Sequence, residues 1–279
     1  MNDTERLKEL RKQIFLMSYS AKTGHLASAY SSLEILYALY VKGILRNTKE
    51  TAGSMNRDKL ILSKGHGSLA LYAVLAEAGF LEKETLMTFA KPDSILGGEP
   101  NRLEVPGVEA TTGSLGHGLS VGVGIACADQ MEKRDCKTYV ILGDGECQEG
   151  SVWEAVMAAG KLCLPNLIVI VDQNKIQKMG SVKDTIGFDE WEQRFASFGF
   201  GTRTVDGHDV NALCSCFRSL STQDRPYVIL ANTIKGHGVS IMENNPVWHW
   251  KQPNKKELKK IVEELSILQE ELDYAKSLH

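Results

Sequence analysis

Two oxygen-bearing side chains follow two apolar, β-rich runs in the middle of the chain. Residues 139–142 lead into a Gly-Asp-Gly turn centred on Asp144, and residues 167–171 lead into an Asp-Gln-Asn sequence that ends at Asn174. A helical pattern separates the two runs, so the segment predicts a βαβ unit whose strand ends face the same side of a sheet. Asp144 and Asn174 are therefore expected to converge on one point, where Mg²⁺ would accept their oxygens together with phosphate oxygens and water.

The pairing of one carboxylate with one amide fits a metal that also binds a diphosphate. A second carboxylate would add repulsion beside a polyanion, whereas an amide oxygen donates a lone pair without charge. Gly145 allows the backbone to approach closely. Gly-Asp-Gly alone fits an ordinary β-turn equally well, and Asn174 after the second strand favours the metal site. A dinucleotide site is excluded, because Gln148 stands where that motif requires glycine.

Length and composition limit the function classes. The chain has 279 residues, 43% of them apolar, and a net charge of −3, which predicts no nucleic-acid or membrane partner. It contains no apolar run of the ~20 residues that span a bilayer. The charged first residues lack a signal-peptide core. Six cysteines without CxxC spacing indicate reduced thiols, and together these features predict a cytoplasmic protein.

The elements that position these residues predict an α/β fold. Further strands are expected at 59–63, 202–205 and 226–233, alternating with helices, which indicates three α/β/α layers around a mainly parallel, doubly wound sheet. We expect residues 1–279 to form a single domain. Residues 1–20 are predicted to form an N-terminal helix. Residues 254–279 carry a narrow heptad stripe that predicts one C-terminal docking helix.

Other residues with chemical potential occupy similar positions. His25 lies in a loop just before a helix, with Ser28 close by, and unpaired backbone N–H groups at such a position favour anions. His66 and Lys235 each follow a predicted strand. Any one of them alone is more typical of a structural or solvated loop residue. Their matching positions in a chain with Gly-Asp-Gly favour a shared anion site.

The sequence GDGECQEGSVWEA, with 28 residues between Gly-Asp-Gly and Asn174, resembles transketolases within the thiamine diphosphate-binding fold family. The chain looks like their N-terminal, diphosphate-binding half. The resemblance implies that Asp144, Asn174 and the carbonyl of Ile176 bind Mg²⁺, or another divalent cation such as Ca²⁺ or Mn²⁺. The residues that it implies for thiamine diphosphate binding are His25, Ser28, His66, Gly113, Leu115, Gly145, Asn174, Lys235 and His249.

The resemblance also implies an activity. Transketolases transfer a two-carbon ketol unit from a ketose phosphate to an aldose phosphate through a carbanion on the cofactor. The matching catalytic residues are His25, His66, His249, Glu149 and Glu154, of which the two glutamates correspond to acids that link paired active sites. The glutamate that activates the pyrimidine ring belongs to a second domain. The chain therefore resembles one subunit of a split transketolase that needs a C-terminal subunit, most simply as an α2β2 heterotetramer.

Four positions depart from the transketolase pattern. Leu-Ala follows His25 where proline is common, and His117 replaces a common glutamine. Glu99 replaces a histidine that contacts the donor's hydroxyl end, and Trp250 replaces glycine. We hypothesise that Glu99 and Trp250 reshape the sugar pocket for an unusual ketose.

Two other functions remain open from the sequence. The half-site also suits a 2-oxo acid decarboxylase or a dehydrogenase E1-like subunit, although the histidines at 25, 66 and 249 resemble ketose-handling residues. The second alternative is a subunit that holds the cofactor but has no catalytic activity. Only the departures from the family pattern at Glu99 and Trp250 support it.

Overall fold

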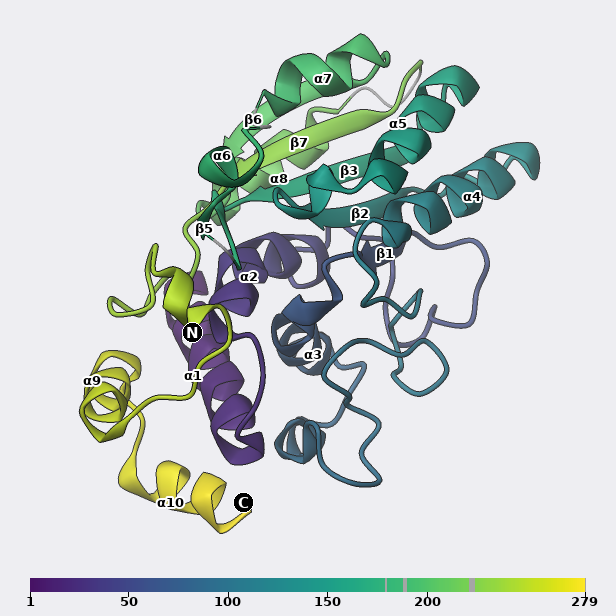
Figure 1. Cartoon of the computed structure of the whole chain (residues 1–279). Coiled ribbons are helices and arrows are strands. Elements are labelled where there is room, and N and C mark those ends of the chain that lie inside the picture. The colour runs from purple at the N-terminus through teal and green to yellow at the C-terminus, as the bar shows by residue number, and fades with distance from the viewer. Residues whose placement is uncertain (179, 188–189, 221–223, 279) are drawn as a thin grey trace.

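The computed structural model describes residues 1–178, 180–187, 190–220 and 224–278. Five parallel strands form its central sheet in the order β1-β2-β3-β7-β6 (Figure 1). The strands are β1 (Lys59–Leu62), β2 (Thr138–Gly143), β3 (Leu167–Gln173), β6 (Gly201–Asp206) and β7 (Tyr227–Asn232). Because every pairing is parallel, all five carboxyl ends lie at one edge of the sheet. The predicted α/β fold with a mainly parallel sheet is confirmed.

The central strands bury side chains on both faces. Successive side chains of a strand point to opposite faces, so an uninterrupted apolar run builds two cores. One core receives Tyr139, Ile141, Ile168, Ile170 and Ile229. The other receives Val140, Leu142, Val169, Val171 and Val228. The sheet is therefore stable only with helices on each side.

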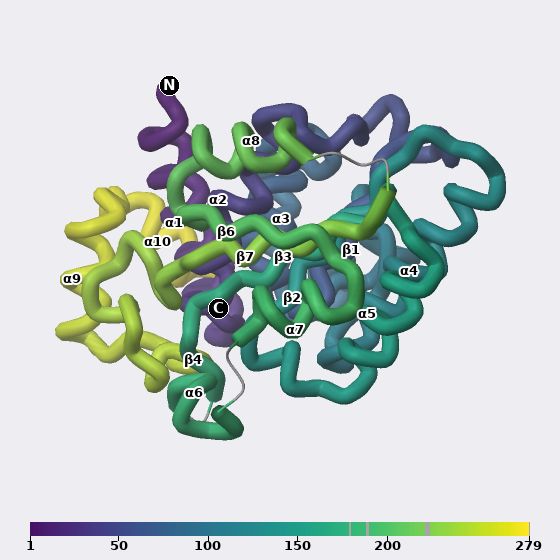
Figure 2. The backbone as a smooth tube through the Cα atoms, turned by 90° about the horizontal axis from the view of Figure 1, so that it is seen from above, coloured from purple at the N-terminus to yellow at the C-terminus, as the bar shows by residue number. Residues whose placement is uncertain are grey.

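Helices supply these two outer layers, as Figures 1 and 2 show. The first core is covered by α1 (Asp3–Ala21), α2 (Leu26–Tyr40), α3 (Ser68–Glu77) and α8 (Val210–Arg218). The second is covered by α4 (His117–Met131), α5 (Gly150–Leu162) and α7 (Trp191–Ser197). A small hairpin of β4 (Ile176–Gln177) and β5 (Gly180–Ser181) precedes the short α6 (Val182–Thr185). No helix within the described ranges has the length and apolar character needed to cross a membrane. All six cysteines are free.

The prediction of one continuous C-terminal helix over 254–279 is wrong. The segment forms α9 (Lys255–Leu265) and α10 (Gln269–Ser277), and residue 279 lies outside the described part of the chain. Ser266 has φ 54°, a left-handed conformation that ends the first helix. The Glu271 carboxylate then accepts the Leu268 N–H at 2.8 Å and starts the second. Both helices still dock on α1, where Lys12 pairs with Glu271 at 2.6 Å.

Candidate functional site

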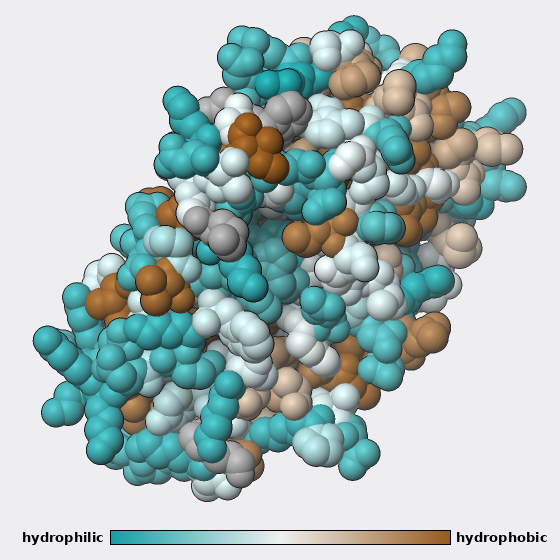
Figure 3. All heavy atoms as spheres, viewed as in Figure 1, coloured by the Kyte–Doolittle hydropathy of each residue, from teal (hydrophilic) through white to brown (hydrophobic). Residues whose placement is uncertain are grey.

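A cavity of about 460 Å³ lies at the carboxyl edge of the sheet, and Figure 3 shows the hollow on this face. The loops after β1, β2, β3 and β7 line it, together with the start of α2 and a turn over Pro246–His249. The predicted residues that it brings together are His25, Ser28, His66, Glu99, Gly113, Leu115, Asp144, Gly145, Glu149, Asn174, Ile176, Lys235 and His249. Residues far apart in the sequence thus meet because the parallel strands end at one edge.

Two predicted residues lie outside the cavity lining. Glu154 is exposed on α5. Trp250 is 65% exposed and stacks on His25, with ring centroids 5.9 Å apart and an interplanar angle of 20°. Trp250 therefore belongs to the rim beside a lining histidine, whereas the role predicted for Glu154 has no support from the cavity.

Backbone N–H groups hold both side chains that are predicted to bind the metal, and Asn174 Oδ1 accepts the Ile176 N–H at 3.1 Å. Gly143 is opposite Asp172 in the register of β2 and β3, so Asp144 begins its loop beside the Asp172 carboxylate. The Asp144 carboxylate accepts N–H groups from Gly145 at 2.8 Å and Lys175 at 2.5 Å. Burial and the Asp172 carboxylate raise the pKa of Asp144 to about 7. A bound divalent cation would favour the ionised form, because an opposite charge lowers a carboxyl pKa.

Several unsatisfied or cationic groups face the same space. The Ser28 hydroxyl is buried without a hydrogen-bond partner among the described residues. The Lys235 ammonium donates to the Ile176 carbonyl at 2.9 Å, and burial, followed by repulsion from Lys64, lowers the pKa of Lys235 to about 8. An orphaned hydroxyl, an ammonium and oxygen ligands together suit an anionic ligand that carries a divalent cation. The residues present therefore fit a metal-bound diphosphate.

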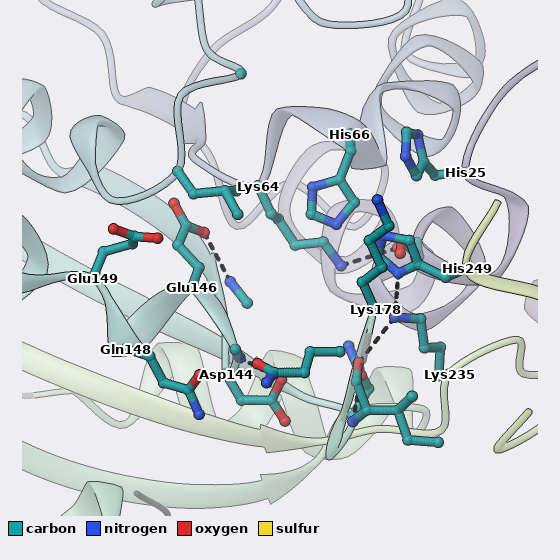
Figure 4. A pocket seen from close by; sticks show the side chains of 18 of the residues that line it. His25, Lys64, His66, Asp144, Glu146, Gln148, Glu149, Lys178, Lys235 and His249 are labelled. Atoms are coloured by element: carbon teal, nitrogen blue, oxygen red, sulfur yellow. Dashed lines mark hydrogen bonds between the residues drawn. The ribbon is translucent and has the colours of Figure 1, made fainter. Parts of the chain in front are cut away.

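Three histidines face one another on the opposite side of the cavity (Figure 4). The His25 ring centroid lies 5.3 Å from those of both His66 and His249, which are 5.8 Å apart. Burial is the main cause that lowers the pKa of all three, and the Lys64 and Lys235 ammonium groups add to it. The pKa of His249 falls to about 3, and its Nδ1 accepts a hydrogen bond from Lys235 at 2.9 Å. Neutral imidazoles offer one donor and one acceptor each, which suits the hydroxyl groups of a sugar.

Sequence reasoning missed a buried ion pair between Lys64 and Asp172. The Lys64 ammonium contacts the Asp172 carboxylate and donates to the Ser28 carbonyl at 3.0 Å. Ser31 and Thr233 also donate to Asp172. Burial alone would raise the pKa of Asp172, but Lys64 and the two hydroxyl groups hold it below its ordinary value. Lys64 follows β1, and Asp172 lies near the end of β3, so both stand beside predicted site residues. Their positions in the sequence could have identified them as site residues.

Sequence reasoning also missed Glu146, Gln177 and Lys178, which all line the cavity. Glu146 belongs to the Gly-Asp-Gly-Glu sequence, and burial raises its pKa. Gln177 and Lys178 come from the hairpin after β3. Their sequence carries no apolar alternation that would have revealed a hairpin.

Comparison with known proteins agrees with this site. Residues 7–271 match the family described as "Transketolase, thiamine diphosphate binding domain". The chain is 39% identical to an apulose-4-phosphate transketolase subunit of Phocaeicola vulgatus over 264 residues, 94% of this chain and 93% of that one. It is 38% identical to "6-deoxy-6-sulfo-D-fructose transketolase subunit SqwG" of Clostridium sp. (strain MSTE9), over 81% of this chain and 82% of that one.

Comparison with a solved structure shows how much of a single-chain transketolase this chain covers. The fold superposes on transketolase from Leishmania mexicana with a TM-score of 0.86 and 26% identity, covering all of this chain but only 44% of that one. Family match, identity and fold lead to the same conclusion. The chain belongs to the transketolase family and contains its thiamine diphosphate binding domain.

Proposed function

We propose that this chain is the thiamine diphosphate-binding subunit of a two-subunit transketolase. With its partner it would transfer a two-carbon ketol unit from a ketose phosphate donor to an aldose phosphate acceptor. The observation that carries the proposal is one cavity that joins Asp144 and Asn174 with three neutral histidines. Two relatives of similar length are themselves named as transketolase subunits, which supports the split architecture.

The metal and the cofactor's diphosphate would bind together at the loops described above. Asp144, Asn174 and the Ile176 carbonyl would hold Mg²⁺, or Ca²⁺ or Mn²⁺ in its place. A carbonyl oxygen has two lone pairs, so Ile176 can accept both Lys235 and a metal ion. Ser28 and Lys235 are placed to bind the diphosphate. When bound, the thiazolium ring supplies a carbon nucleophile for the ketose carbonyl.

The histidines would act on the sugar. At neutral pH His25 and His66 can each accept a proton from one hydroxyl and donate an N–H to another oxygen. Lys235 donates to Nδ1 of His249, so in the neutral ring Nε2 carries the N–H and donates it to a substrate oxygen. This hydroxyl chemistry favours ketol transfer over 2-oxo acid decarboxylation. Ketose cleavage without CO₂ release, measured on the assembled enzyme, separates the two, and CO₂ release would contradict the proposal.

Removal of the Asp144 carboxylate tests the metal and diphosphate site. Asp144→Ala in the assembled enzyme is expected to weaken thiamine diphosphate binding in Mg²⁺ by at least about 100-fold, since even outer-shell partners of a metal contribute 10–100-fold. Isothermal titration calorimetry gives the Kd, and a thermal shift gives an independent reading. Asp273→Ala, at an exposed carboxylate, is the matched control. Wild-type affinity in Asp144→Ala would remove Asp144 from the metal site.

The partner would cover the mouth of the cavity. Exposed apolar side chains surround this mouth: Leu115 and Ile186 line the cavity, Trp250 stacks on His25, and Val247 belongs to the same turn as His249. Their exposed fractions run from 37% for Leu115 to 65% for Trp250. Such a gathering marks a surface that another protein covers. We propose that the occupant is the subunit with the pyrimidine-binding and C-terminal domains, in an α2β2 assembly.

Glu99 is proposed to set donor preference. Its carboxylate lines the cavity against Gly113, where an added Cβ would lie 2.1 Å from Oε2. Among the described residues its carboxylate has no hydrogen-bond or ion-pair partner, so it is free to accept a hydrogen bond from a sugar hydroxyl. The two relatives named for apulose 4-phosphate and 6-deoxy-6-sulfo-D-fructose indicate that such subunits serve uncommon sugars.

Replacement of Glu99 should change the order of donors. In the assembled enzyme, Glu99→His is expected to change the ratios of kcat/KM among a panel of ketose donors. The change should correspond to about 1–3 kcal/mol of transition-state stabilisation, the cost of one polar contact. Glu99→Gln, which keeps the shape and removes the charge, shows which property matters. Trp250→Gly tests the other hypothesised specificity residue. An unchanged donor ranking in Glu99→His would remove Glu99 from the proposal.

A further inference from the structure

Glu146 is a buried acid whose carboxylate is hydrogen-bonded to other groups of the protein. It begins a turn over Glu146–Gln148, directly after Gly145, and is only 3% exposed. In Figure 4 it lies on the Glu149 side of the cavity, away from the three histidines. A buried carboxylate needs hydrogen-bond donors around it, so its partners indicate its role.

Three donors from three separate segments converge on this carboxylate. Oε1 accepts the Ser63 hydroxyl at 2.5 Å and the Gly116 N–H at 2.9 Å, while Oε2 accepts the Gly143 N–H at 3.0 Å. Ser63 follows β1, Gly143 ends β2, and Gly116 immediately precedes α4. Because all three partners donate, the carboxylate acts only as an acceptor. It therefore ties the loop before α4 to the ends of two strands.

The backbone of Gly116 is held at its carbonyl as well. The Ser151 hydroxyl donates to the Gly116 carbonyl at 3.1 Å. Gly116 has φ +82°, and an added Cβ would lie 2.5 Å from the Ser151 hydroxyl and 2.7 Å from Glu149 Cβ. Only glycine fits this position. The segment from Glu146 to Ser151 thus holds Gly116 by both its backbone N–H and its backbone carbonyl, and so fixes the two peptide groups on either side of this residue.

The gripped loop forms one wall of the cavity. Gly113 and Leu115 line the cavity, and Gly116 follows them directly. A carboxylate fully engaged by three donors has no donor to offer a diphosphate, and its charge would repel one. The contribution of Glu146 to binding therefore acts through the loop.

We propose that Glu146 is a positioning residue that holds the 113–116 loop in its binding conformation before thiamine diphosphate arrives. The inference rests on the proposed function, because it assigns that ligand to the cavity. Preorganisation of this kind removes an ordering cost from the binding step. Loss of the Glu146 contacts should therefore raise the Kd for thiamine diphosphate by a larger factor than it lowers kcat at saturating cofactor.

Glu146→Gln is the test, because the amide keeps the size but presents an NH₂ group to one of the N–H donors. In the complex with the partner subunit, we expect the Kd for thiamine diphosphate in Mg²⁺ to rise about 10–100-fold, the range for residues that support a ligand site indirectly. We expect kcat at saturating cofactor to stay within about threefold. Hydrogen exchange of residues 113–118 should accelerate without ligand, whereas α8 should exchange as in the wild type. Glu132→Gln, at an exposed position after α4, should change neither quantity.

The outcomes separate this inference from the proposed function. If the wild-type complex binds no thiamine diphosphate, the proposed function fails, and the exchange of 113–118 still shows whether Glu146 holds the loop. Unchanged Kd and exchange in Glu146→Gln would overturn the inference, and so would a lower kcat with unchanged Kd. If circular dichroism shows Glu146→Gln to be unfolded, Ser63→Ala removes one of the three donors. Faster exchange of 113–118 and a raised Kd in Ser63→Ala then support the inference, and wild-type values overturn it.

Discussion

The purified chain by itself is expected to show no ketol transfer at an ordinary enzymatic rate, and a partner with the pyrimidine-binding domain should restore it. The chain spans 44% of the length of a one-chain relative, and apolar side chains stand exposed around its cavity mouth. We expect the other subunit to supply the activating glutamate, as the family resemblance implies. A single acid or base contributes about 10²–10⁴-fold, and the partner should supply at least that increase. A coupled assay of the aldose product, with the two proteins tested separately and mixed, measures it.

A partner variant separates assembly from chemistry. A partner whose activating glutamate is replaced by alanine should still form the complex, yet leave the ketol transfer near background. Light scattering after size exclusion gives the stoichiometry, for which we expect two copies of each chain. Substantial transfer by the unpartnered chain would contradict the split-enzyme proposal.

Breaking the Lys64–Asp172 pair is expected to have the largest effect on stability. Lys64→Met leaves the Asp172 carboxylate buried with only hydroxyl donors, and Asp172 is fully buried. Removing one partner of a buried pair costs about 3–5 kcal/mol, because the remaining charge is uncompensated. The free energy of unfolding should fall by this amount in Lys64→Met, measured by urea denaturation of the ligand-free chain.

The double variant and a surface pair provide the controls. Lys64→Met with Asp172→Asn should lose less stability than the sum of the two single variants, since no unpaired charge remains. Lys276→Met breaks the solvent-exposed contact with Asp273 and should leave the free energy of unfolding nearly unchanged. Strict additivity of Lys64→Met and Asp172→Asn would show that the pair is not coupled.

Much of the fold and part of the site follow from local sequence patterns. The apolar runs at 139–142 and 167–171 are long enough to identify buried parallel strands, and Asp144 and Asn174 stand directly after them. A parallel sheet then requires these ends to meet, so their proximity follows from topology. The same reasoning placed His66 and Lys235 at the correct edge.

Features that depend on tertiary contacts could not be predicted in this way. Lys64 and Asp172 look like ordinary strand-end charges until the register places them in contact. The left-handed Ser266 divides a segment whose heptad stripe continues across it. The sequence did not reveal that Trp250 lies on the rim of the cavity, where its ring stacks on His25. A residue motif alone does not specify such orientations.

The cavity unites residues from near both ends of the chain, since the rings of His25 and His249 lie 5.3 Å apart. During synthesis from the N-terminus, this wall is incomplete until residue 249 has left the ribosome. A ligand stabilises only the state that binds it, so a chain cut before His249 would lose the stabilisation that depends on this wall.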